Sequence, residues 1–318
     1  MQTRAEDDAA RAAPRRKRSS AGRSGHASAL RRQQSRYAIL FIAPGLAVYL
    51  LFMVYPFLNT IYLSLTNWNG VAESKDFVGL ANYARMVGDG AALKAFYNNV
   101  IWVIIGTIAP VAIGLFEALL VWSGKRGSLT FRTLFFLPFV LPLVVVGLVW
   151  QWIYHPLYGI VNKALEGVGL GEFARGWLAD PQMALYAVLI AAIWGASGFC
   201  FLILHASLQN VDMSTVEASM IDGANWFQRA WNVIIPQIAP QLTMVTTVTL
   251  IGGFAVFDII YVMTGGGPGH ASEVLATYTY KTAFQQNEAG YGSALAMLIT
   301  ALSFVSAVLF VRLRERQR

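Results

Sequence analysis

Charged residues are scarce in this sequence. Of its 318 residues only 13% are Asp, Glu, Lys or Arg, whereas 56% are hydrophobic. A soluble domain of this length needs far more charge to cover its surface. The composition therefore excludes an ordinary soluble globular protein and indicates an integral membrane protein.

Cysteine and histidine are also rare. Cys200 is the single cysteine, so an intrachain disulfide is excluded, and its apolar surroundings indicate a small core residue. The four histidines are scattered without metal-ligand spacing: His26, His155, His205 and His270. We expect no metal site, no cofactor and no catalytic constellation.

A nucleotide-binding phosphate loop is missing. In SGKRGS (123–128) Leu119 stands where the pattern G-x-x-x-x-G-K-[ST] requires its first glycine, and no lysine follows TGGGPG (264–269). The chain is therefore not expected to be an enzyme that hydrolyses ATP by this route. Any ATP hydrolysis that drives it must take place on a separate polypeptide.

Long apolar runs, by contrast, are abundant. A helix needs about 20 apolar residues to cross the roughly 30 Å hydrocarbon layer. The sequence predicts an all-α polytopic protein with six transmembrane helices, at about 38–58 (continuing amphipathically to Leu65), 100–122, 134–154, 184–204, 238–263 and 289–311.

Two regions differ in composition. Residues 1–36 are rich in Ala, Arg, Ser and Gly, without apolar periodicity, which predicts a disordered basic cytoplasmic tail. Residues 37–318 form the predicted six-helix domain, with its core at about 95–312. The run after the tail is too long for a signal peptide and has no clear cleavage site, so it indicates a retained anchor.

The basic residues predict the orientation. With the N-terminus inside, eighteen of the 24 Lys and Arg residues fall in inner segments and six in outer connections. Basic residues favour the cytoplasmic side, so both termini are predicted to be cytoplasmic. Because ten of these basic residues precede the first predicted membrane helix, we expect contact with membrane lipid and no nucleic-acid partner.

The inner connection QNVDMSTVEASMIDGANWFQRAWNVIIP (209–236) is unusually polar. Asp212 or Ser214 can cap a helix, and Glu217 stands in capping-box register with Ser214. Gly223 can end that helix in the left-handed conformation. A second helix is predicted to begin near Asn225, exposing Trp226, Phe227 and Trp231, with re-entry into the membrane at Pro236 and Pro240.

From these residues alone two interpretations of the connection remain open. It is either a surface that docks into a partner, or a stiff loop whose aromatic side chains lie in the headgroup zone.

The stretch EASMIDGAN (217–225) resembles the cytoplasmic loop of permease subunits of binding-protein-dependent ABC importers. That family pattern is roughly EAAxxDGA, with a proline thirteen residues after the glycine. Ser219 replaces the second alanine, and the matching residues are Glu217, Ala218, Asp222, Gly223, Ala224 and Pro236. The resemblance implies a coupling loop at 210–236 whose helix fits a groove on an ATPase subunit. It assigns polar contacts to Glu217, close approach to Ala218 and the turn to Gly223.

Further stretches resemble the carbohydrate-type branch of the same family, which includes sugar and glycerol-3-phosphate permeases. They are FVGLANYARM (77–86), FRTLFFLPFVLP (131–142), GLVWQWIYHPLYGIVNKAL (147–165), WLADPQMAL (177–185), FDIIYVMTGGGPG (257–269) and GYGSALAML (290–298). The resemblance covers about 38–312 and implies the type I ABC importer permease fold in a bacterial-type cell membrane. It implies a second permease subunit as heterodimer partner, an ATPase dimer, an extracytoplasmic solute-binding protein and a sugar substrate.

Two carboxylates fall at predicted membrane depth, where charge is costly and usually faces the bundle interior or water. For Glu117 we favour a structural role. Asp258 has Phe254, Phe257 and Tyr261 at helical steps, and such an aromatic and acidic face suits a sugar. We hypothesise that these four residues line the translocation path. The alternative is that Asp258 only bridges neighbouring helices or lies near the outer interface.

Thr264 through Pro268 predict a rigid outer turn. By the resemblance this turn faces the cavity or the binding protein, and a plain connecting loop is the alternative.

The function predicted from the sequence is an ATP-driven import permease for a mono- or oligosaccharide delivered by a binding protein. The alternative is a secondary transporter or channel that acts without an ATPase. The acidic coupling-type loop and the lack of a membrane-embedded ion relay argue against it. A membrane enzyme or receptor would need a catalytic cluster or a sensing module, and neither is visible.

Overall fold

A computed structural model describes residues 41–122 and 128–315, and it divides the chain into two units, 1–59 and 60–318. The described residues are helical apart from loops, and their β pairing is limited to one isolated antiparallel bridge between Thr66 and Phe77. The first unit contains the start of a helix at Phe41, with a π-helical turn at Leu50–Val54. The predicted tail (1–36) lies outside the described residues, as do Lys125, Arg126, Arg316 and Arg318.

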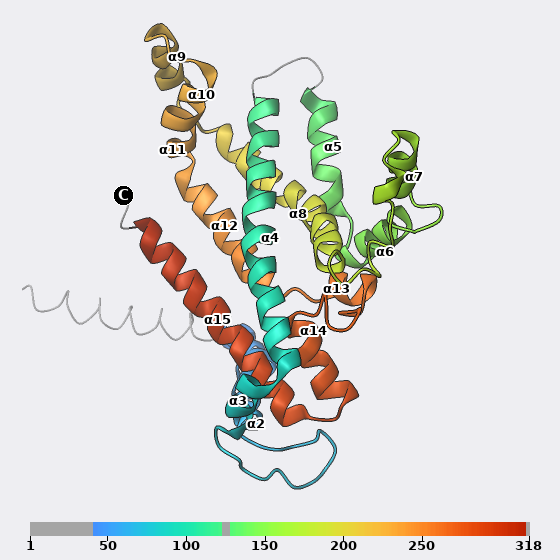
Figure 1. Ribbon diagram of the computed structural model, residues 1–318. Coiled ribbons are helices and arrows are strands. Elements are labelled where there is room, and N and C mark those ends of the chain that lie inside the picture. The colour runs from blue at the N-terminus through green and yellow to red at the C-terminus, as the bar shows by residue number, and fades with distance from the viewer. Residues whose placement is uncertain (1–40, 123–127, 316–318) are drawn as a thin grey trace, which may run out of the picture. The chain divides into compact units, whose positions relative to one another are not determined.

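The helix α2 (Tyr55–Ser64) ends in the second unit, and the α-helices that follow it belong to that unit (Figure 1). Short 3₁₀ or π-helical turns occur at Gly171–Phe173, Ala230–Ile234 and Lys281–Gln285. The remaining helices are α3 (Ala81–Gly88), α4 (Gly90–Trp122), α5 (Ser128–Val140), α6 (Leu143–Ile153), α7 (Ile160–Gly167), α8 (Ala184–Leu208), α9 (Met213–Ile221), α10 (Trp226–Arg229), α11 (Ile235–Gln237), α12 (Ala239–Phe254), α13 (Asp258–Met263), α14 (Leu275–Tyr280) and α15 (Ala289–Glu315).

Four helices are long and apolar enough to cross a membrane: Phe41–Ser64, Gly90–Trp122, Ala184–Leu208 and Ala289–Arg314. They correspond to the predicted first, second, fourth and sixth spans. Two bent helix pairs raise the number to six if each pair is one span. The six-span, all-α prediction is therefore confirmed, but two of its spans are not straight helices.

The predicted third span (134–154) is wrong as a single helix. It consists of α5 and α6, which meet at an angle of 101°. Pro142 stands at the N-cap of α6 in an extended conformation (φ −55°, ψ 140°). A proline has no N–H to donate and disfavours helical geometry in the preceding residue, so the helix stops at Val140 and restarts at Leu143.

The predicted fifth span (238–263) is also interrupted, because α12 ends at Phe254 and α13 begins at Asp258. In a continuous helix the carbonyl of Gly253 would accept the N–H of Phe257. Instead it accepts a hydrogen bond from the side chain of Asn99 at 3.4 Å. A tertiary contact from α4 therefore replaces the local bond where the helix breaks.

The core of the second unit is built around the contact of α4 with α8, with α12 packed against α4. Gly114 of α4 lets the backbones of α4 and α8 approach each other closely. A Cβ atom there would lie 2.6 Å from the Cβ of Cys200 and 2.6 Å from the backbone nitrogen of Phe201. Small residues at helix contacts let backbones approach closely where lipid provides no hydrophobic drive. The buried Cys200 is thus a packing residue, as its sequence context indicates.

Apolar side chains remain uncovered on several helices. Phe304 on α15 is 69% exposed, and only 11% of the apolar window of α15 is buried. Apolar surface of this extent needs lipid or a partner subunit to cover it.

Adding side-chain volume at the α4–α8 contact tests the packing of this core. Gly114→Val should lower the thermal unfolding midpoint of the purified protein in detergent, because overpacking costs about 1–3 kcal/mol. Gly88→Val is the control, since a Cβ at Gly88 has nothing within 4 Å. Equal midpoints for the two variants would contradict the packing role of Gly114.

Candidate functional site

The connection between α8 and α12 folds as a compact helical unit. Asp212 is the N-cap of α9, and its carboxylate accepts hydrogen bonds from the backbone N–H of Ser214 (3.0 Å) and the hydroxyl of Thr215 (2.8 Å). Of the two predicted caps, the structure uses Asp212 and not Ser214. The side chain of Glu217 is left exposed on α9.

The turn after α9 depends on Gly223. Its φ is +79°, the left-handed conformation predicted for this position. The N–H of Gly223 donates to the carbonyl of Met220, and the N–H of Ala224 donates to that of Ser219. This pair of bonds is the Schellman pattern, which satisfies the last carbonyls of a helix. The turn sets the direction in which α10 leaves α9.

The helix α10 begins immediately after this turn. Asn225 and Gln228 form a capping box, in which each side chain bonds the other's backbone N–H at 2.9 and 2.8 Å. The predicted second helix near Asn225 is therefore confirmed. Phe227 and Trp231 are exposed, at 78% and 73%.

This helical pair is fixed to the ends of the spans. Val216 is buried in a cluster with Leu119 of α4 and Leu208 of α8. The backbone N–H of Asp212 also donates to the side chain of Gln237, in α11, at 2.9 Å. The loop is consequently a rigid extension of the transmembrane helices and not a flexible connector.

Four of the predicted coupling residues are exposed on this unit, whereas Ser219 and Ala224 are half-buried. Glu217, Ala218, Asp222 and Gly223 are exposed, and Ile221 beside them is 87% exposed. Pro236 lies apart from them, in the first turn of α11. The exposed face combines two carboxylates, an aliphatic side chain and a small alanine. A surface of mixed polar and apolar atoms can pack against a complementary protein surface.

A cavity of about 210 Å³ lies in the centre of the helices. It is bordered by α4, α6, α8, α12 and α13, and its lining is mostly apolar and small: Trp102, Gly106, Leu143, Ala192, Ile193, Ala196, Thr249, Gly252, Gly253, Val256 and Ile259. Sequence reasoning did not identify this cavity, because small apolar residues are equally typical of helix packing. The glycine pair Gly252–Gly253 is the signal that could have pointed to it.

Of the predicted path residues, the structure brings the rings of two into contact. The rings of Phe257 and Tyr261 stack at 5.0 Å with an interplanar angle of 16°, and Asp258 is exposed at the start of α13. Phe254 is separate: it ends α12 and is 7% exposed. The helical-step argument was wrong for Phe254 because the helix is broken between it and Asp258. Sequence reasoning also missed Tyr280, which packs against both Phe257 and Tyr261.

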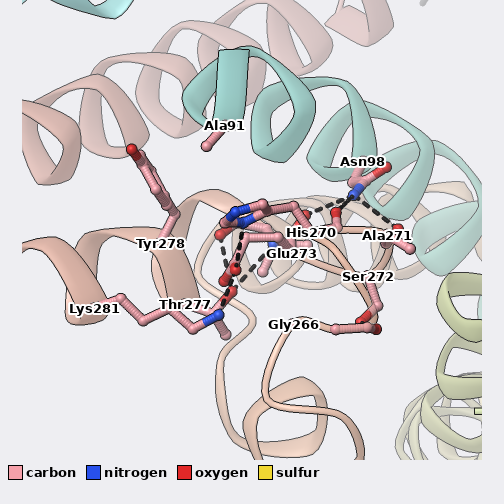
Figure 2. A network of polar contacts seen from close by, with 12 residues as sticks. Ala91, Asn98, Gly266, His270, Ala271, Ser272, Glu273, Thr277, Tyr278 and Lys281 are labelled. Carbon is pink, nitrogen blue, oxygen red and sulfur yellow. Dashed lines mark hydrogen bonds and ion pairs between the residues drawn. The ribbon is translucent and has the colours of Figure 1, made fainter. Parts of the chain in front are cut away.

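A polar network lies beside the turn 264–269, as Figure 2 shows. Asn98 on α4 donates to the carbonyls of His270, Ala271 and Glu273. The carboxylate of Glu273 is fully buried and pairs with Lys281 and His270.

Gly266 leaves room for that carboxylate. A Cβ atom at Gly266 would lie 2.5 Å from Glu273 Oε1. The close packing of Gly266 on Glu273 agrees with the predicted rigidity of this turn, which stays a prediction.

Comparison with known proteins identifies the family of this chain. Residues 110–318 match the family model described as binding-protein-dependent transport system inner membrane component. The chain belongs to this family. It is 35% identical to the probable ABC transporter permease protein YurN of Bacillus subtilis over 272 residues, 85% of this chain and 93% of the relative. It is thus the permease subunit of an ABC importer, a membrane component that is not itself catalytic.

Other relatives carry more specific names. The permease is 32% identical to the sulfoquinovosyl glycerol transport system permease protein SmoG of Agrobacterium fabrum, over 87% of this chain and 89% of that one. It is 29% identical to the trehalose/maltose transport system permease protein MalF of Thermococcus litoralis, over 92% and 98% of the two chains.

Among solved structures, a chain of a bacterial alginate ABC transporter superposes with a TM-score of 0.79 at 18% identity. The superposition covers 91% of this permease and 96% of that chain. This likeness confirms the ABC importer permease fold.

The helix cap at Asp212 makes the permease loop sensitive to acid. Hydrogen bonds from Ser214 and Thr215 hold the pKa of Asp212 below its ordinary value of 3.8. A carboxyl group with a lowered folded-state pKa stabilises the fold above the unfolded pKa and loses that effect as the pH falls through the folded value. Hydrogen exchange of residues 213–221 in wild-type protein should therefore accelerate, relative to Asp212→Asn, as the pH falls below about 3.8. If the ratio of the exchange rate in the wild type to that in Asp212→Asn stays constant with pH, this role of the cap is contradicted.

Proposed function

We propose that this permease imports a mono- or oligosaccharide, and that a separate ATPase dimer drives it by docking on the loop 210–236. The observation that carries the proposal is the rigid α9–α10 unit, whose free face presents Glu217, Ala218 and Ile221. Because Val216 anchors this unit among the ends of α4 and α8, a force applied to its free face reaches the spans directly.

The transport path has two parts in this proposal. The central cavity lies among α4, α8 and α12, and Asp258 and Tyr261 lie exposed beyond it on α13. A second permease subunit covers the exposed sides and completes the path. ATP binding favours one of two arrangements of the helices, which opens the cavity to alternate sides of the membrane.

The proposed orientation puts both termini and the loop 210–236 in the cytoplasm. The outer turn 264–269 then faces an extracytoplasmic binding protein. The excess of basic residues in the inner segments supports this orientation.

The names of the relatives support a carbohydrate cargo. They include transport systems for trehalose/maltose, sulfoquinovosyl glycerol, diacetylchitobiose and starch degradation products. Glycerol-3-phosphate is the non-sugar cargo that the sequence resemblance includes.

The docking face can be tested by charge reversal and by breaking its turn. Glu217→Lys and Gly223→Pro should each lower ATP hydrolysis coupled to transport by roughly tenfold or more in the complex assembled with its ATPase. The reasons are that a reversed charge at a docking surface costs several kcal/mol, and that proline cannot adopt the φ of +79° at Gly223. The measurement is substrate-stimulated ATPase activity in proteoliposomes.

Matched controls lie in the outer connection between α7 and α8. Glu172 is exposed there, and Gly169 has a φ of +80° with nothing within 4 Å of a Cβ atom. Glu172→Lys and Gly169→Pro impose the same changes on the opposite side and should retain coupling. Persistence of coupling in both loop variants would overturn the assignment of the docking face, and activity without any ATPase would indicate a secondary transporter.

The cargo and path are tested by uptake into proteoliposomes that hold the complete importer. The panel is maltose, trehalose, diacetylchitobiose, sulfoquinovosyl glycerol and glycerol-3-phosphate. We expect uptake of at least one sugar, and a severalfold decrease in Asp258→Asn, because the exposed carboxylate accepts hydrogen bonds from sugar hydroxyls. Phe254→Ala tests the buried ring in parallel. Unchanged uptake and unchanged substrate-stimulated ATP hydrolysis in both variants would remove these residues from the path.

A further inference from the structure

Four aromatic rings from two separate parts of the chain form what we call the outer aromatic cluster: Phe257, Tyr261, Tyr280 and Phe284. Tyr280 packs edge-on against the stacked pair, with ring centroids 5.4 Å from Phe257 and 5.3 Å from Tyr261. Phe284 extends the cluster at 5.4 Å from Tyr280. The cluster thus joins the start of α13 to α14 and the π-helical turn that follows it.

The cluster is open and carries polar groups. Tyr261 is 39% exposed and Phe284 is 73% exposed, so the rings do not form a sealed core. The side chains of Tyr261 and Tyr280 share a hydrogen bond that raises the pKa of Tyr280. Asp258 adds an exposed carboxylate beside Phe257. The cluster therefore presents flat apolar rings together with hydroxyl groups and a hydrogen-bond acceptor.

The start of the cluster adjoins residues of the central cavity along the chain. Val256 and Ile259 line that cavity, and Phe257 and Asp258 lie between them in the chain. The chain therefore passes directly from the lining of the cavity into the first ring of the cluster. An aromatic patch elsewhere on the surface would have no such connection.

A buried ion pair holds the second half of the cluster. Lys281 lies between Tyr280 and Phe284, and its ammonium group pairs with the fully buried carboxylate of Glu273 (Figure 2). The backbone carbonyl of Glu273 accepts a hydrogen bond from Asn98 at 2.8 Å. Because a buried charge is costly without its partner, this pair fixes the turn that carries both rings.

We propose that the outer aromatic cluster is a stacking site for a pyranose ring, which holds the sugar between the outer face and the central cavity. This site rests on the proposed function, since it needs a sugar cargo. The C–H face of a pyranose ring packs on aromatic rings, while Asp258 and the tyrosine hydroxyls bond its hydroxyl groups. The site keeps the released sugar from escaping outward before the helices rearrange.

The test measures sugar taken up per ATP hydrolysed. It uses the complete importer in proteoliposomes, saturating binding protein and whichever panel sugar the wild type transports. Tyr280→Ala and Phe284→Ala should each lower this ratio about threefold or more, because a lost aromatic contact weakens retention by a comparable factor. A general folding defect would lower uptake and ATP hydrolysis together and leave the ratio unchanged.

Two variants serve as controls. Tyr280→Phe keeps the ring and should retain most of the ratio. Phe304→Ala removes an exposed ring of α15 outside the cluster and should leave the ratio at the wild-type value.

The outcomes separate this site from the function on which it rests. If the wild type transports sugar and the two alanine variants keep its ratio, the stacking site is refuted and the import function stands. Loss of co-purification of the second permease in those variants also refutes it, because the rings would then be a subunit interface. If the wild type transports no sugar of the panel, both proposals fail.

Discussion

The hydrogen bonds of Asn98 and Asn99 satisfy backbone groups that a broken helix cannot satisfy by itself. In lipid every unpaired N–H or C=O costs several kcal/mol, so a span can be interrupted only where other groups replace the lost bonds. Asn99 donates to the carbonyl of Gly253 and accepts the N–H of Leu275, while Asn98 binds three carbonyls of residues 270–273. These two side chains therefore connect α4 to the break after α12, to residues 270–273 and to the start of α14.

The two ends of α12 are held by different partners. Its C-terminal end is attached to α4 through Asn99, and its N-terminal end follows Trp226–Gln237 at a bend of 77°. The central cavity lies at the Asn99 end of α12, where Thr249, Gly252 and Gly253 line it. A rigid element that reaches from the loop to the cavity wall is the physical requirement for coupling a docking event to a change in access.

Two carboxylates of the second unit, those of Glu273 and Asp89, have polar or charged partners. The fully buried Glu273 has Lys281 and His270 as partners. At the junction of α3 and α4, burial disfavours the charged form of Asp89, but hydrogen bonds from Tyr278 and Tyr291 outweigh it and lower its pKa. The cavity itself is lined without a charged side chain among the described residues, so a neutral, polar solute meets no electrostatic barrier there.

The sequence by itself determined the class of protein, the helical spans and the chemistry of the loop. Hydropathy over about 20 residues is a local property, and so is the left-handed turn that Gly223 allows after the cap at Asp212. Only the tertiary structure decided where spans break and which aromatic side chains meet. The break before Asp258 depends on Asn99 from a helix more than a hundred residues away, and Tyr280 reaches Tyr261 only through the turn held by Glu273. Contacts between residues so far apart leave no periodic pattern along the chain, because each is set by packing and by the need to satisfy polar groups inside the membrane.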